Sequence, residues 1–438
     1  MYLYELPTTG AISFSDFCID QTIDKRHTGS IPAATQARAN VRAVLKDSKR
    51  TEHGQKDYLQ PVKLLEDYLP QLRGIIECLA HDEISLQSEP SFSWRTTLSA
   101  NIFNTSPRLS IPGLQADLAF SLLTYAFALS NLARSTTISL GRYERDRAIS
   151  ELDRKAKDEQ LNVAVDFLCR ASGIFTYIAD TVLPAWESEA KRAPMAFEKP
   201  PDLSREVNSA LAKMALAEAQ SLAIRKLLSK AAYESNIAPG PPLPRSHPSP
   251  SLIAKLHLEC TSLYSSALSL VKSTGARKRP SSAPEASGEV SSELRRYLAD
   301  QVVLHGALGR KWLGVDAGEK GGMQKAGDAV AYLAWAKKEL EELKDSGRGI
   351  NIARGGEKDM RDRLKEKVVD ELESVNLFYK YYKKANNSTV ASLSTNPDAG
   401  RFTSQSTCWC NGNCSKAAYT ASSRFWSGFH CTCASSDR

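Results

Sequence analysis

Cysteine and histidine gather near the end of the chain, where their types could support metal chemistry. Thiolates and imidazoles bind zinc in tetrahedral sites, so a zinc-binding regulatory or catalytic protein is one hypothesis. Two cysteines separated by a single residue can bind the same ion only in a strained geometry, however, and CxxC pairs are absent. We therefore expect no metal or other cofactor and keep the zinc site as the alternative. The candidate ligands are Cys408, Cys410, Cys414, His430, Cys431 and Cys433.

The other residues that could do chemistry are scattered along the chain. Cys18, Cys78, Cys169 and Cys260 stand singly among apolar residues, where a reduced thiol behaves as a small hydrophobe. His305 falls on the apolar stripe of its segment, which favours a core or groove-lining role over a catalytic one. No phosphate-binding loop and no dinucleotide, zinc-protease or serine-hydrolase motif occurs. We predict that the protein is not an enzyme.

Composition and charge indicate a globular protein with a modest positive net charge. The chain has 438 residues, of which 42% are hydrophobic and 24% charged, and its formal net charge is +7. That excess is too small to indicate a nucleic-acid partner. No uninterrupted apolar run reaches the roughly 20 residues that span a bilayer, and residues 1–14 lack the features of a signal peptide. We expect a cytoplasmic protein.

Apolar residues recur every three or four positions from residue 59 onward, which predicts an all-α protein. Helices joined in sequence by short loops favour antiparallel hairpins packed as a solenoid-like array. The helices are expected near residues 59–79, 114–133, 161–183, 200–230, 252–271, 293–313, 325–343 and 364–382.

The segments between these helices are predicted to be irregular. Residues 1–50 show no long helical period and are expected to form extended segments. An aromatic stretch at 91–98 is expected to lead into a helix, and 101–112 to form a loop. Proline-rich, polar and glycine-rich stretches predict loops at 238–251, 273–292 and 314–322. Arg277 to Arg279 is interpreted as a solvated loop, with attraction to a membrane surface or to an acidic partner as the alternative.

The chain is expected to have two parts. Helical periodicity continues to residue 385, which defines a body of residues 1–385. Residues 386–438 are rich in Cys and Ser and carry too few apolar residues to build a core. We interpret this segment as a disordered tail or as a divergent end of the gene model.

Apolar residues on two consecutive helices suggest a surface for a partner. Leu252 and Leu256 are four residues apart at the start of one helix and so share a face. Leu222, Ile224 and Leu227 crowd the end of the preceding helix. A groove between these helices could accept the apolar face of a partner helix, although ordinary core residues follow the same pattern.

Several segments together resemble the BRO domain family, which is found in Alix and in fungal pH-signalling proteins. The resemblance extends in order from residue 2 to about residue 384. It includes residues 6–9 (LPTT) and 92–95 (FSWR) near the N-terminus. The helical segments that carry it are 114–133, 163–186, 208–230, 252–270 and 327–340.

The resemblance implies a boomerang-shaped helical fold with a small stranded segment near the N-terminus, and it implies no catalysis. Such domains bind the C-terminal amphipathic helix of the charged ESCRT-III subunit in an apolar groove. The family's two apolar groove positions fall on Leu252 and Leu256. A third, usually aromatic, falls near Ala223 and Ile224, of which we favour Ile224.

The resemblance also implies a cellular role. In fungi, such proteins support alkaline ambient-pH signalling and endosomal sorting. They help to recruit ESCRT-III and the machinery that activates the PacC transcription factor by proteolysis. The expected partners are therefore the charged ESCRT-III subunit and a pH-signalling complex, and the expected location is the cytoplasm with recruitment to the plasma or endosomal membrane.

Overall fold

A computed structural model describes residues 1–51, 56–99, 108–146, 148–190, 199–234, 241, 243–275, 289–346 and 356–394. The chain divides into a unit from Met1 to Ser388 and a second unit from Thr389 to Arg438. The first unit contains nearly all of the described residues and is the subject below. The division into a body of residues 1–385 and a tail remains a prediction.

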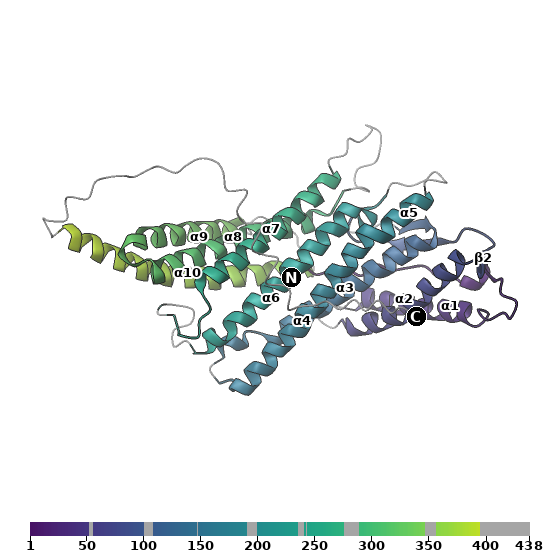
Figure 1. Ribbon diagram of the computed structural model, residues 1–438, viewed down its shortest axis with the longest axis horizontal. Coiled ribbons are helices and arrows are strands. Elements are labelled where there is room, and N and C mark those ends of the chain that lie inside the picture. Colours follow the sequence, from purple (N-terminus) through teal and green to yellow (C-terminus); the bar gives the residue numbers. More distant parts are fainter. Residues whose placement is uncertain are drawn as a thin grey trace. The chain divides into compact units, whose positions relative to one another are not determined.

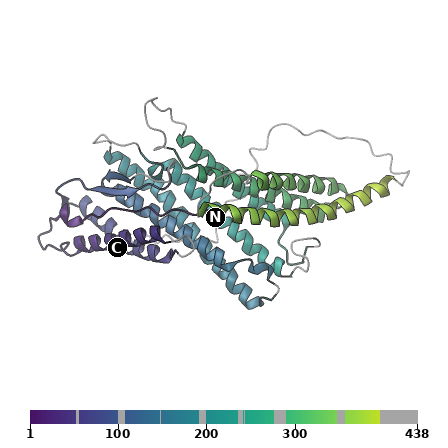
Figure 2. The same cartoon turned by 180° about the vertical axis from the view of Figure 1, so that it is seen from behind.

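Helices that follow one another in sequence pack side by side in the first unit (Figure 1). This arrangement confirms the predicted all-α fold of antiparallel hairpins. Figure 2 shows from behind how α8, α9 and α10 lie together. The helices are α1 Ser30–Arg50, α2 Leu59–Ala80, α3 Leu114–Leu140, α4 Glu151–Tyr177, α5 Leu183–Ala190, α6 Arg205–Glu234, α7 Pro250–Gly275, α8 Ser292–Lys320, α9 Ala326–Ser346 and α10 Gly356–Ser394.

The first helix corrects the prediction of extended structure up to residue 50. Residues 1–29 contain only a short 3-10 turn and the strand β1, but α1 follows them. Its buried face includes Ala34, Arg38 and Val41 at helical spacing. Because an alanine and an arginine occupy the buried face, the apolar residues of this helix do not recur regularly and its period is hard to detect in the sequence.

Two short antiparallel strand pairs lie in the N-terminal part of the first unit. Strand β1, Cys18–Asp20, pairs with β2, Ile84–Leu86, and β3, Ser91–Arg95, pairs with β4, Arg108–Pro112. Phe92 and Trp94 on β3 are buried. The predictions of a helix start at 91–98 and of a loop throughout 101–112 were therefore wrong, because the pairing of β3 with β4 joins segments whose partnership a single sequence does not reveal.

Glycines in α8 allow other helices to approach it closely. A loop was predicted at 314–322, but α8 continues to Lys320. A Cβ atom on Gly314 would lie 2.8 Å from Leu333 Cγ and 3.0 Å from Ala329 O of α9. One on Gly318 would overlap the ring of Tyr382 of α10. These glycines make room for packing between helices and do not end the helix.

Pro184 does not end the helical path, although the sequence predicted a stop there. A π-helical turn at Ile178–Val182 joins α4 to α5, and Pro184 occupies the first turn of α5. Because the helical path is continuous, Pro184 removes one N–H donor to the preceding turn, and the π-helical turn before it accommodates the altered hydrogen bonding.

Helix α3 forms the centre of the core. Two helical stretches, Leu114–Arg145 and Glu151–Ser188, are long and apolar enough to cross a membrane by length and composition. The apolar window of the first is 94% buried within the protein, and that of the second is 33% buried. A buried core helix meets the same criterion, and α3 is covered on most sides, as its sequence predicted.

Candidate functional site

Helices α6 and α7 pack against each other in a defined antiparallel register. Gln220 Nε2 on α6 donates a hydrogen bond of 2.7 Å to the carbonyl oxygen of Leu256 on α7. One turn away, Cys260 Sγ lies 3.7 Å from the carbonyl oxygen of Ala217. These contacts place the middle of α6 beside the first half of α7.

The two leucines predicted on α7 are accessible at the surface. Leu252 is 37% exposed, and Leu256 is partly exposed while its inner side packs against the core. Leu263 and Leu270 continue the same face at seven-residue intervals and are also partly exposed. One side of α7 thus presents four apolar side chains, with the exposed Glu259 between Leu256 and Leu263.

The neighbouring side of α6 extends this apolar surface. Leu216, Gln220, Ala223 and Leu227 are spaced by four, three and four residues and share one face. Ala223 is exposed and Leu227 is 40% exposed. Because Gln220 contacts Leu256, this face of α6 lies beside α7. We call the set of Leu216, Ala223, Leu227, Leu252, Leu256 and Leu263 the α6–α7 surface.

Ile224 points away from the α6–α7 surface. Its side chain is only 3% exposed, and it lines a cavity of about 570 Å³ together with Leu222. Of the two residues expected near the third groove position, Ala223 is therefore the one that is exposed. Leu216 and Leu263 were not predicted as surface residues, because their helical spacing is visible in the sequence but their exposure is not.

Lysines lie next to the apolar side chains. Lys255 is exposed between Leu252 and Leu256, and Lys213 is partly exposed one turn before Leu216. Lys226 Nζ donates to Asn162 Oδ1 at 2.7 Å on the side of α6 that faces α4. Glu259 is also exposed on α7 between Leu256 and Leu263, so the charges beside the apolar side chains have both signs.

The inner side of α7 carries a buried pair of histidines. His257 Nδ1 lies 3.1 Å from His305 Nδ1 of α8, so one ring donates the hydrogen bond and the other accepts it. Burial lowers the pKa of His257 to about 3 and that of His305 well below its usual value. His305 is fully buried, in agreement with a core role. Both imidazoles are neutral near pH 7.

Several residues singled out in the sequence lie outside the described part of the chain. They include the basic stretch from Arg277 to Arg279 and all of the tail ligands. The zinc alternative therefore remains a hypothesis. The tail ligands are Cys408, Cys410, Cys414, His430, Cys431 and Cys433.

Comparison with protein families and curated proteins gives consistent matches. A family model described as BRO1-like domain matches residues 11–388. A "pH-response regulator protein palC" from Cryptococcus neoformans is 37% identical over 425 residues, which cover 89% of this chain and 86% of that protein. A protein of the same name from Emericella nidulans is 26% identical over 408 residues, covering 83% of this chain and 75% of the relative.

Solved structures share the fold at low sequence identity. A crystal structure of ALIX in complex with a late domain matches with a TM-score of 0.52 at 16% identity, covering 87% of this chain. The match covers 46% of the ALIX chain, so this chain spans about half of that structure. A structure described as the basis for endosomal targeting by the Bro1 domain matches with a TM-score of 0.52 at 14% identity, covering 90% of this chain and 86% of that one.

Proposed function

The chain belongs to the BRO1-like domain family, and from this premise we propose that it is a non-enzymatic adaptor in fungal ambient-pH signalling. Two relatives, matched over most of their length, are named pH-response regulators. The family assignment carries the adaptor role, since members of this family act by binding other proteins. No cofactor is part of this proposal.

The proposed partner is the C-terminal amphipathic helix of the charged ESCRT-III subunit, bound on the α6–α7 surface. The observation that carries this proposal is the position of Leu252 and Leu256, which lie in line on α7 and remain accessible. Each leucine that a partner helix buries contributes roughly 1.5–3 kcal/mol of transfer free energy before ordering costs. Lys255 adds attraction for acidic side chains of the partner.

Recruitment of ESCRT-III would connect the protein to the proteolytic activation of PacC. The adaptor would act in the cytoplasm and reach the plasma or endosomal membrane through the pH-signalling complex. The Bro1 domain whose structure resembles this chain is described as a basis for endosomal targeting, which supports such a location.

The partner proposal is tested by charge substitutions at the surface. Leu252→Asp and Leu256→Asp should each abolish co-precipitation of the charged ESCRT-III subunit, while circular dichroism stays helical. Leu152→Asp is the matched control, because Leu152 is 78% exposed at the start of α4 and is not part of the α6–α7 surface. Unchanged binding by the Leu256 variant would overturn the assignment of this surface.

A further inference from the structure

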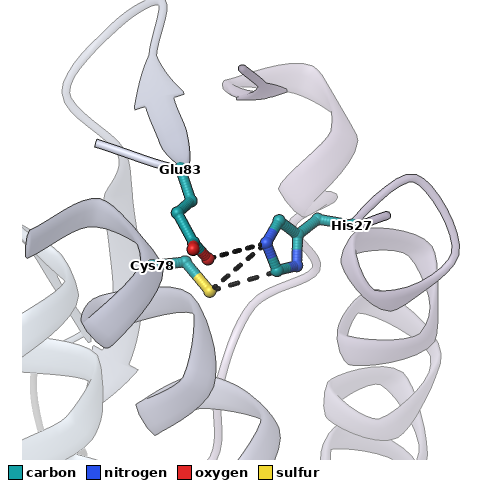
Figure 3. Close-up of side chains that lie close together, drawn as sticks. All are labelled: His27, Cys78 and Glu83. Carbon is teal, nitrogen blue, oxygen red and sulfur yellow. Dashed lines mark hydrogen bonds and ion pairs between the residues drawn. The ribbon is translucent and has the colours of Figure 1, made fainter. Parts of the chain in front are cut away.

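Three side chains with metal-binding atoms meet near the first strand pair (Figure 3). His27 lies between β1 and α1, Cys78 lies in the last turn of α2, and Glu83 directly precedes β2. His27 Nε2 is 2.9 Å from Glu83 Oε2, and Cys78 Sγ is 3.9 Å from the same nitrogen. One donor atom from each residue lies within 4.8 Å of the other two.

The backbone around Cys78 and Glu83 holds these side chains together. The N–H of Glu83 donates to the carbonyl oxygen of Cys78 at 2.9 Å, closing the turn after α2. Asp82 occupies this turn with a φ of 57°. The N–H of Gln21 donates to the carbonyl oxygen of Glu83 at 2.9 Å, which continues the pairing of β1 with β2. The helix end and the strand start are therefore fixed relative to each other.

The loop that carries His27 is also held in place. Asp20 Oδ2 accepts a hydrogen bond of 2.8 Å from the backbone N–H of His27, and Asp20 Oδ1 accepts one of 2.9 Å from that of Thr22. Lys25 adopts a φ of 52° and donates through Nζ to the carbonyl oxygen of Asp20. The imidazole thus points at Cys78 and Glu83 from an ordered turn.

The donor types and distances fit a zinc ion. Zinc binds thiolate at about 2.3 Å and imidazole nitrogen at about 2.0–2.1 Å, so the two ligand atoms of a tetrahedral site lie about 3.6 Å apart. The sulfur-to-nitrogen distance of 3.9 Å is close to this value. His27 Nε2 and Glu83 Oε2, now 2.9 Å apart, would move to about 3.4 Å apart on binding the ion.

A nucleophilic role for Cys78 fits the geometry less well. The sulfur is 3.9 and 4.0 Å from the two ring nitrogens, which is longer than the hydrogen bond between a nucleophile and its base. Burial and the nearby Glu83 carboxylate raise the pKa of the Cys78 thiol, which opposes formation of a free thiolate. A bound cation would reverse this effect, because metal binding displaces the proton.

We propose that His27, Cys78 and Glu83 form a zinc-binding site whose fourth position is open to water or to a side chain of a partner. The ion would pin the loop before α1 to the turn between α2 and β2. Arg26 forms an ion pair with the other oxygen of Glu83 and so competes with the cation for this carboxylate.

Cobalt titration of the purified full-length protein, stripped of metal with a chelator, tests the proposal. Cobalt bound by a thiolate in tetrahedral geometry gives a charge-transfer band in the near ultraviolet and intense visible bands. Cys78→Ser should lose one equivalent of this signal, whereas the matched control Cys169→Ser should keep it. Cys169 is another partly buried helical cysteine, and any signal from the tail is common to both variants.

Three further variants test the other two ligands and the competing ion pair. His27→Ala and Glu83→Gln should each weaken zinc binding by about tenfold or more, measured by competition with a chromophoric chelator. Arg26→Gln should tighten it. Thermal unfolding without metal verifies that each variant is folded. Equal cobalt spectra and zinc affinities for Cys78→Ser and Cys169→Ser would overturn the proposal.

Discussion

The guanidinium of Arg38 on α1 forms a two-point ion pair with the carboxylate of Asp117 on α3, with Nη2 2.9 Å from Oδ1 and Nε 3.2 Å from Oδ2. Both side chains are buried, and Tyr68 and Trp94 donate further hydrogen bonds to the same carboxylate at 2.6 and 2.7 Å. One acidic side chain therefore connects α1, α2, α3 and β3.

Replacing Asp117 should destabilise the protein strongly. Asp117→Ala leaves the buried Arg38 without its counter-charge, although Arg38 still donates to the Gly10 carbonyl oxygen and to Thr9 Oγ1. It also removes the acceptor of the Tyr68 and Trp94 donors, and the change should cost about 3–5 kcal/mol in the free energy of unfolding. Urea denaturation followed by circular dichroism measures this change. Glu151→Ala, which breaks the exposed pair with Lys155, is the control and should change stability by less than about 1 kcal/mol. A small effect of Asp117→Ala would show that the network contributes little.

Two glycine substitutions should have opposite effects. Gly314→Ala places a methyl group against Leu333 and the carbonyl oxygen of Ala329, and it should destabilise the protein by about 1–3 kcal/mol. Gly173→Ala on α4 meets no atom within 4 Å and should stabilise it by about 0.5–1 kcal/mol. Thermal unfolding of both variants compares them directly. Stabilisation by Gly314→Ala would contradict the tight packing of α8 against α9.

An aromatic residue at Ala223 should strengthen the proposed partner interaction. Ala223 is exposed on α6, so a phenyl ring there adds apolar area to the α6–α7 surface. Ala223→Phe should tighten binding of the ESCRT-III helix about tenfold, equivalent to about 1.4 kcal/mol. Calorimetric titration with the synthetic helix measures this. The control is Ala33→Phe at an exposed position of α1, and an equal gain in both variants would argue against a specific site.

The buried histidine pair should make the protein sensitive to acid. The pKa of His257 is about 3 in the folded state, mainly because of burial, against about 6.5 in an unfolded chain. Between these values the unfolded state binds a proton that the folded state does not, so stability falls as pH falls. The slope is about 1.4 kcal/mol per pH unit for each such histidine.

Removing His257 should reduce this slope. For His257→Gln, the free energy of unfolding measured between pH 6 and pH 4 should decrease less steeply than for the wild type, whatever the change at pH 7. His81→Gln is the control, because a hydrogen bond with the Glu77 carbonyl raises the pKa of His81 and its contribution has the opposite sign. An unchanged slope in the His257 variant would contradict a neutral buried pair.

The sequence predicted the helices better than the elements between them. The period of α3 was clear because apolar side chains surround that helix. The strands β3 and β4 were missed because each is five residues long and is stabilised by the other. Gly314 was interpreted as a loop residue because its role as a contact point depends on α9, which follows later in the chain.

The candidate surface was only partly predictable. Helical spacing placed Leu252 and Leu256 on one face, and the structure shows both to be accessible. The choice of Ile224 over Ala223 could not be decided by spacing, since adjacent residues on a helix point about 100° apart and either could face the partner. Packing against the cavity decided that Ile224 is inside.

The amino-acid sequence alone determined that this chain forms amphipathic helices and resembles a known family. The reason is that helical periodicity and local conformational preferences depend on residues that are close together in the sequence. Only the tertiary structure decided which helical faces remain open and which distant side chains meet. His27 and Cys78 are far apart in sequence, and their approach depends on the pairing of β1 with β2 and on the turn after α2. The physical reason is that burial and convergence arise from contacts between remote segments, which a local pattern does not specify.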